Sequence, residues 1–223
     1  CVAGPGNLYR AEGNANDAIG GAHATFSSAS YASGRYGQSF SFNGAGQYVA
    51  LPPAVGDFGA GDFTVAVWLN TTSPIAVSDV LSKRGSCAGG SPYQGFDLRM
   101  GGVAGNLYLE IWTSAGYAGF GTSGVRVNDG LWHHVAVVRQ GSAVRIHVDG
   151  TTRATSSISG SIVDPTNTPV YLGVGRCVPG APGSNGAQDG TAWFNGRLDE
   201  PGLYRRAMSA SELTATAQGL CEP

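Results

Sequence analysis

The chain has 223 residues, of which 13% are charged and 36 are glycine, and its formal net charge is −2. This length suits one large β domain or two small ones, and the low charge excludes the basic surface that nucleic-acid binding requires. No apolar stretch approaches the ~20 residues that span a bilayer, which excludes an inserted membrane helix. Glycines that stand singly between apolar runs predict turns and bulges rather than disorder.

Apolar residues alternate with polar ones through most of the chain, and this period of two predicts β-strands. The run 63–69 places alternate residues, beginning with Phe63 and Val65, on one face. The later predicted strands cover 96–100, 107–112, 132–139, 144–148, 169–174 and 194–204. Tight turns are predicted at 140–142 and 149–150. This regular spacing predicts an antiparallel two-sheet sandwich.

One helix is predicted near the C-terminus. Ser209 and Glu212 have capping-box spacing, in which the Ser209 hydroxyl accepts from the Glu212 amide and the Glu212 side chain reaches back. Gly219 is the expected end of this helix. No linker-like segment divides the chain, so residues 1–223 are expected to form a single domain.

The four cysteines, Cys1, Cys87, Cys177 and Cys221, are widely spaced and form no C-x-x-C pair. This pattern disfavours a zinc cluster, and the even number favours two disulfides in an oxidising compartment. Three pairings are possible. We prefer Cys1–Cys221, because domain termini often lie close together, and this leaves Cys87–Cys177. We therefore expect a secreted, extracellular or cell-surface protein whose chain, beginning at Cys1, is a mature or trimmed product.

Seven sequence motifs resemble, in order, those of the bacterial laminin-G-like family within the concanavalin A-like superfold. They are AEGNAND at 11–17, GRYGQSFSFNG at 34–44, FTVAVW at 63–68, WHHVAVV at 132–138, VDG at 148–150, FNGRLDE at 194–200 and LYRRAMS at 203–209. The resemblance implies an all-β, two-sheet antiparallel jelly-roll sandwich with one short C-terminal helix. Because this fold carries lectins, adhesion modules and enzymes, the function has to be argued from particular side chains.

The resemblance also implies a structural calcium ion (Ca²⁺) held by Asp17, with Asn16 as its neighbour, and by Asn43 and Asp199. Hard cations take several carboxylate and carbonyl oxygens. Asn43 stands where the family commonly has aspartate, which removes one negative charge and weakens binding. In the alternative interpretation, Asp17 and Asn43 only shape turns by accepting hydrogen bonds from nearby backbone amides.

A sugar site needs aromatic faces and a few polar groups that converge in a cleft. Alternation turns four side chains of the strands 96–100 and 107–112 away from the core, and two loops beside Cys87 and Cys177 supply further candidates. The complete set is Arg84, Tyr93, Gln94, Arg99, Tyr108, Glu110, Trp112, Asn185, Asp189 and Trp193. We predict that they bind a glycan or polysaccharide at the concave face or its rim loops. A disulfide joining the loops would preorganise the site.

Two pairs of residues, His133 with His134 and Trp68 with Trp132, are expected to have structural rather than binding roles. His133 and His134 are successive residues of a strand, so they point to opposite faces and cannot chelate one ion together. Trp68 and Trp132 lie inside the strand motifs of the family and are expected to fill the core.

Catalysis has little support in the sequence. A glycosidase needs two carboxylates ~5–9 Å apart, and Asp97 could face Glu110 only beside Arg99, which would hold a carboxylate ionised. A polysaccharide lyase would need Arg99, Gln94, His147 and Tyr108 to converge. We therefore expect a non-catalytic, lectin-like, carbohydrate-binding module. A protein-interaction or adhesion module is the alternative, followed by a lyase or glycosidase.

Overall fold

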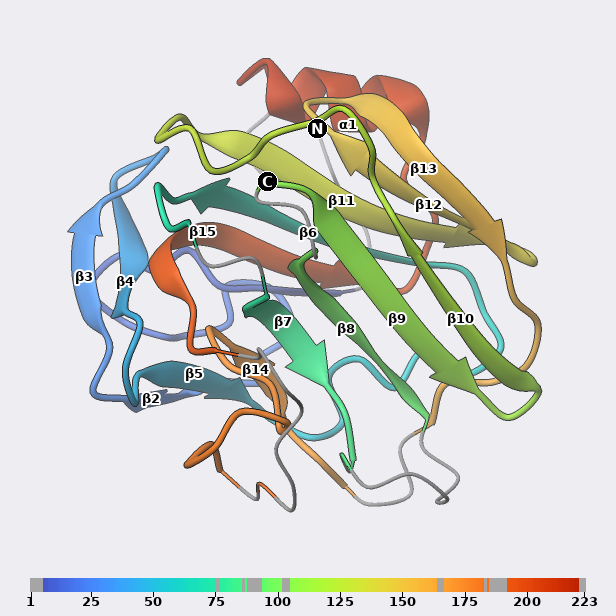
Figure 1. Cartoon of the computed structure of the whole chain (residues 1–223), viewed down its shortest axis with the longest axis horizontal. Coiled ribbons are helices and arrows are strands. Elements are labelled where there is room, and N and C mark those ends of the chain that lie inside the picture. Colours follow the sequence, from blue (N-terminus) through green and yellow to red (C-terminus); the bar gives the residue numbers. More distant parts are fainter. Residues whose placement is uncertain are drawn as a thin grey trace.

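The computed structural model describes residues 6–74, 77–85, 87, 94–101, 105–163, 167–182, 184 and 192–220. Within these residues, two antiparallel sheets face each other across an apolar core that draws side chains from both (Figure 1). The predicted all-β jelly-roll sandwich is thereby confirmed. None of the helices described is long and apolar enough to cross a membrane.

The first sheet has the strand order β13-β12-β11-β6-β15-β4-β3, with β1 paired to β15. Its strands are β1 (Gly6–Leu8), β3 (Ser30–Ser33), β4 (Gln38–Asn43), β6 (Phe63–Asn70), β11 (His133–Gln140), β12 (Ala143–Val148), β13 (Thr151–Ser157) and β15 (Asn195–Tyr204). The second sheet has the order β10-β9-β8-β7-β14-β5-β2. Its strands are β2 (Thr25–Ser27), β5 (Tyr48–Leu51), β7 (Asp79–Lys83), β8 (Gly95–Met100), β9 (Leu107–Thr113), β10 (Gly116–Gly121) and β14 (Val170–Leu172).

Strand β6 is buried on both faces, and each face has its own cover. Phe63 and Val65 point into the core between the sheets, as their alternation predicts. Ala66 points the other way and packs with residues of β11, the segment before α1 (Ala210–Ala217), and Leu213 of α1. The helix therefore covers the outer face of the first sheet, where it lies beside β11 to β13 in Figure 1.

The predicted turns also form. Asp149 and Gly150 have φ angles of 52° and 76°, as the two central residues of a tight hairpin between β12 and β13 require. The hairpin between β11 and β12 turns at Gly141, whose φ is 59°.

Alternation did not predict β1 to β5, β7, β10 or β13. Strand β13 is polar and largely exposed, and β10 has three glycines among six residues. Both strands pair through their backbones at a sheet edge, where no apolar face is needed.

The capping box is present at the start of α1. The Ser209 hydroxyl accepts from the Glu212 amide at 3.2 Å, and the Glu212 carboxylate accepts from the Ser209 amide at 2.8 Å. Gly219, with φ of 71°, follows the C-cap.

Ser209→Ala is expected to lower the free energy of unfolding by about 1 kcal/mol, because the Glu212 amide loses its acceptor. Chemical denaturation measures this change. Ser211→Ala, in the same turn, is the control and should cost less. Equal losses in the two variants would show that the cap does not stabilise α1.

Candidate functional site

Polar and aromatic side chains gather on the outer face of the second sheet, over β7 to β10. In β9, Leu107, Leu109 and Ile111 are buried in the core, while Tyr108, Glu110 and Trp112 are half-buried on the outer face. Strand β8 pairs in register, so Asp97 lies opposite Glu110 and Arg99 opposite Tyr108. The predicted placement of these strand residues is therefore what the structure shows.

Glu110 is the centre of a charged network. Its Oε2 lies 3.0 Å from the guanidinium of Arg99 and 3.5 Å from that of Arg84. Its Oε1 accepts from the Tyr117 hydroxyl at 3.0 Å. Arg84 also lies 3.4 Å from Asp97. These contacts orient Glu110 on the sheet.

Aromatic rings flank this network. The guanidinium of Arg84 lies 4.5 Å from the ring centroid of Trp112, and that of Arg99 lies 5.2 Å from the ring of Tyr108. Tyr117 of β10 lies 5.4 Å from Trp112 and is 54% exposed. We call Arg84, Arg99, Tyr108, Glu110, Trp112 and Tyr117 the aromatic platform.

A glycine in β10 makes room for the platform. A Cβ at position 119 would approach the hydroxyl oxygens of Tyr117 and Tyr108 closely, to 2.6 Å in the case of Tyr108. A larger residue here would push the two hydroxyl groups aside, so glycine accommodates both rings as they lie. The glycine-rich composition of β10 therefore serves the site as well as the sheet edge.

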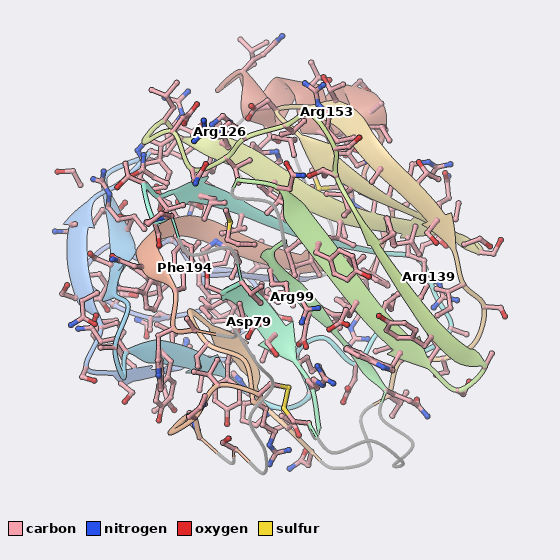
Figure 2. All side chains as sticks on the ribbon, viewed as in Figure 1. Asp79, Arg99, Arg126, Arg139, Arg153 and Phe194 are labelled. Atoms are coloured by element: carbon pink, nitrogen blue, oxygen red, sulfur yellow. A yellow bond between two sulfur atoms is a disulfide. The ribbon has the colours of Figure 1, made fainter. Side chains whose placement is uncertain are left out.

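Two aspartates lie beneath the platform. Asp79 and Asp97 are each 2% exposed. Burial raises the pKa of Asp79 to about 8, and the neighbouring Asp97 carboxyl adds to the increase. Burial likewise raises the pKa of Asp97, against the opposing effect of Arg84. Asp79 lies beside Arg99 on the paired strand (Figure 2).

Asp79→Asn is expected to flatten the pH dependence of stability. Because the pKa of Asp79 is about 8 in the folded protein and 3.8 otherwise, its stabilising contribution is present below pH 4 and lost as the pH rises to 8. Asparagine cannot ionise, so the variant should gain stability relative to the natural protein as the pH rises. Denaturation curves between pH 4 and 9 measure this difference, and parallel pH profiles would refute it.

The disulfide Cys87–Cys177 is present, with a Cα–Cα distance of 5.3 Å, as predicted. It links the segment after β7 to the segment after β14. Beside it, Val174 and Val178 pack with Tyr171 of β14. The segment after β14 therefore covers the outer face of the second sheet over β14 and β5, while the aromatic platform stays partly exposed. The predicted partners Cys1 and Cys221 lie outside the described residues.

Gln94 and Trp193 have partners outside the platform. Gln94 accepts from the Val163 amide at 2.9 Å. Trp193 packs against the apolar cluster around Tyr171. Tyr93, Asn185 and Asp189 lie outside the described residues.

The three predicted calcium ligands have separate hydrogen-bond partners. The Asp17 carboxylate accepts from Asn7 and from four backbone amides, those of Leu8, Ile19, Gly20 and Ala22. Burial acts to raise the pKa of Asp17, but these bonds outweigh it and the pKa is lowered.

Asp199 accepts from the amides of Arg35, Tyr36 and Glu200, and Asn43 from that of Ala45. Burial raises the pKa of Asp199 to about 6, although the amides oppose the increase. Asp17 and Asn43 thus accept from nearby backbone amides, as the alternative interpretation requires, and Asp199 accepts from amides as well, two of them far away in the chain. Calcium binding remains a prediction.

The two histidines of β11 have different surroundings, as their alternation predicts. The His133 ring nitrogens lie 2.8 Å from Asp149 and 3.1 Å from Asp129, and the hydrogen bond to Asp149 is the main cause of its raised pKa. His134 is buried 5.2 Å from the ring of Trp68, and burial lowers its pKa to about 4. The lyase constellation does not assemble, because His147 lies in the first sheet and Arg99 in the second.

The prediction that Trp132 fills the core is wrong. Trp132 is half-buried at the edge of β11, where the guanidinium of Arg197 lies 5.4 Å from its ring centroid. Trp68 is buried, but on the outer face of the first sheet, with Arg35 4.9 Å from its ring. The alternation of residues 63–69 turns Trp68 away from Val67 and from the core between the sheets, so the period of two predicted its side better than membership of the motif did.

The family to which the sequence matches agrees with the observed fold. Residues 43–214 match the laminin-G model of the concanavalin A-like lectin/glucanases superfamily. The chain belongs to this family, as the motifs indicated. Among curated proteins, none has a significantly similar sequence.

Solved structures with the same fold include domains bound to a saccharide and the binding domain of a mosquitocidal protein. Domain 4 of AbnA, an extracellular arabinanase from Geobacillus stearothermophilus solved with arabinotriose, is 19% identical, with a TM-score of 0.72 over 95% of this chain and 97% of that one. The CBM40 of the Ruminococcus gnavus IT-sialidase, bound to α2,3-sialyllactose, is 20% identical, with a TM-score of 0.55 over 72% of this chain and 84% of that one.

The binding domain of Paraclostridial Mosquitocidal Protein 1 is 15% identical, with a TM-score of 0.70 over 96% of this chain. This chain spans 52% of that domain, so about half of it has no counterpart here. At these identities the likeness establishes the fold alone.

Proposed function

We propose that the protein is a non-catalytic carbohydrate-binding module whose ligand lies on the aromatic platform. The observation that carries this proposal is Glu110, held by Arg84, Arg99 and Tyr117 between the rings of Tyr108 and Trp112. Aromatic rings present C–H-stacking faces to a sugar, while a fixed carboxylate and guanidinium pair with its hydroxyls.

The platform is preorganised for a rigid ligand. Arg84 and Arg99 each contact both Glu110 and an aromatic ring, so the side chains lose little freedom when a ligand arrives. The adjoining segment is tied down by Cys87–Cys177. The glycan-bound states of the arabinanase domain and the sialidase domain support the same class of ligand.

The carboxylates favour binding over hydrolysis. Asp97 is the cross-strand partner of Glu110, but it is 2% exposed and contacts Arg84. Asp79 is equally buried. A glycosidase needs two carboxyl groups that both reach the scissile bond, and of the carboxylates described here, Asp79, Asp97 and Glu110, only Glu110 is partly exposed.

The disulfide supports a secreted or cell-surface location, because disulfides persist in oxidising compartments. The structural calcium ion expected at Asp17, Asn43 and Asp199 is also part of the proposal.

A glycan-array screen of the protein, run with calcium and again with EDTA, tests the proposal. Binding to a defined glycan class is the expected result, and its loss in EDTA would support a role for calcium. If the protein binds no glycan in either condition, although a cooperative unfolding transition shows that it is folded, the proposal is contradicted. A protein-interaction module would then be the better interpretation.

A further inference from the structure

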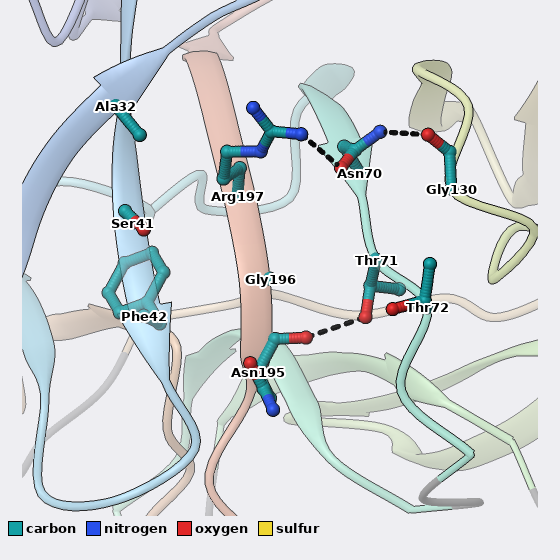
Figure 3. Close-up of a pocket in the computed structure, with 10 residues that line it drawn as sticks. All are labelled: Ala32, Ser41, Phe42, Asn70, Thr71, Thr72, Gly130, Asn195, Gly196 and Arg197. Atoms are coloured by element: carbon teal, nitrogen blue, oxygen red, sulfur yellow. Dashed lines mark hydrogen bonds between the residues drawn. The ribbon is translucent and has the colours of Figure 1, made fainter.

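A polar groove opens on the first sheet, away from the aromatic platform. It has a volume of about 460 Å³ and lies over the ends of β4, β6 and β15 (Figure 3). The lining residues are Ala32, Ser41, Phe42, Asn70, Thr71, Thr72, Gly130, Asn195, Gly196 and Arg197. Arg197 is the charged residue of this lining, and the others are neutral.

Arg197 is held in place from three sides. Its guanidinium donates to the Ser33 carbonyl and to Asn70 Oδ1, each at 2.9 Å, and lies over the ring of Trp132. Asn70 is 7% exposed and donates in turn to the Gly130 carbonyl. Figure 3 shows this chain of bonds from Arg197 across the upper edge of the groove. The cation is therefore preorganised.

The charge of Arg197 has no carboxylate within ion-pair distance among the described residues. The described hydrogen bonds use two of its five N–H donors, which leaves donors for a planar anion. Arginine matches a carboxylate in geometry and charge. The groove is thus suited to a ligand with one negative group.

The rest of the lining suits hydroxyl groups. Thr72 and Asn195 are exposed, and Ser41, which pairs with Arg197 across the sheet, is half-exposed. Gly196 keeps the floor open, because a Cβ there would lie 2.6 Å from the Asn70 carbonyl oxygen. Small hydroxyls and amides around one guanidinium fit the mixed chemistry of an acidic sugar.

We propose that this groove is a second binding site, which takes a carboxylate-bearing saccharide with its carboxylate on Arg197. The site lies on the sheet opposite the aromatic platform and does not depend on it. A chain with both sites would bind two sugars at once, which increases the avidity for a polymer.

Isothermal titration calorimetry with three acidic probes tests the proposal: trigalacturonate, a hyaluronan hexasaccharide and 3′-sialyllactose. Each is paired with a neutral match, which is the methyl ester for the first two and lactose for the third. At least one acidic probe should bind about 10-fold or more tightly than its match, since a charge-assisted hydrogen bond is lost in the neutral form. Acetate tests whether a carboxylate alone suffices.

Two variants assign the site. Arg197→Gln should remove the preference for the acidic probe. Ser41→Glu places a carboxylate beside Arg197 that competes with the ligand, so it should weaken binding about 10-fold or more, while Ser41→Gln should not. Trp112→Ala should leave this binding unchanged, which separates the groove from the platform.

Three outcomes would overturn the proposal. In the first, no acidic probe binds more tightly than its neutral match. In the second, acetate binds as tightly as the sugars. In the third, Ser41→Glu binds the acidic probe as tightly as Ser41→Gln does. Loss of acidic-probe binding in Trp112→Ala with no effect of Ser41→Glu would assign that ligand to the platform instead.

Discussion

Trp112→Ala is expected to weaken binding of the platform's glycan by about 30-fold or more. A tryptophan at the centre of a binding surface contributes about 2 kcal/mol or more when it is truncated. Trp112 is half-buried, and its ring is oriented by Arg84 at 4.5 Å and Tyr117 at 5.4 Å. The variant removes the stacking face and releases both neighbours. Titration calorimetry with a glycan identified on the array measures the change.

Trp132→Ala is the matched control, because Trp132 is also half-buried but lies in the first sheet. With a neutral array ligand, which has no carboxylate for Arg197 beside this ring, it should bind as the natural protein does. If Trp112→Ala binds the glycan as tightly as the natural protein does, the aromatic platform is not the binding site. Circular dichroism of each variant shows whether its fold is retained.

Arg84→Met is expected to lower the free energy of unfolding by about 3–5 kcal/mol. The methionine keeps the apolar stem but leaves Asp97 without the cation 3.4 Å away. Both side chains are nearly buried, at 7% and 3% exposure, so water does not replace the lost charge. The change should also disturb Trp112, whose ring the guanidinium covers. Urea denaturation at pH 7 measures the loss.

The pH dependence distinguishes a charge effect from a packing effect. Without Arg84 the pKa of Asp97, already raised by burial, should rise further. The stability deficit should therefore shrink as the pH falls and Asp97 takes up a proton. Arg153→Met, at an exposed position of β13, is the control and should change stability by less than about 0.5 kcal/mol. If the stability deficit of Arg84→Met does not vary with pH, the loss of stability comes from packing rather than from the missing charge.

The exposed strand residues of the platform were predictable from the period of two. In β9 the apolar set Leu107, Leu109 and Ile111 has to face the core, and this fixes Tyr108, Glu110 and Trp112 on the other face. The same argument places Arg99 in β8. These positions can be predicted without knowing the partner strands, because burial of the apolar residues alone determines which side chains face outward.

Residues set by register and by pairing partners were not predictable. Asp79 lies on the outer face beside Arg99, but a register shift between Asp79 and Leu81 breaks the alternation of β7. Tyr117 comes from β10, whose glycines carry no apolar signal. The tight packing of Tyr117 and Tyr108 over Gly119 is a signal visible only after β10 has been paired with β9.

The groove around Arg197 shows the same limit. FNGRLDE was assigned to the calcium site through its aspartate, and nothing in that motif connects Arg197 with Asn70, which is 127 positions away in the chain. The contact exists because β15 and β6 are neighbours in the first sheet. Strand order brings such residues together, and strand order follows from the complete fold.

The most direct test of the proposed glycan site follows the indole N–H signals of the four tryptophans by NMR while the array ligand is titrated. Assignment uses single Trp→Phe variants. We predict that the Trp112 signal shifts with a saturating dependence on glycan, while the signal of the buried Trp68 stays in place. A glycan that saturates the protein and shifts other indole signals without moving that of Trp112 would contradict the account.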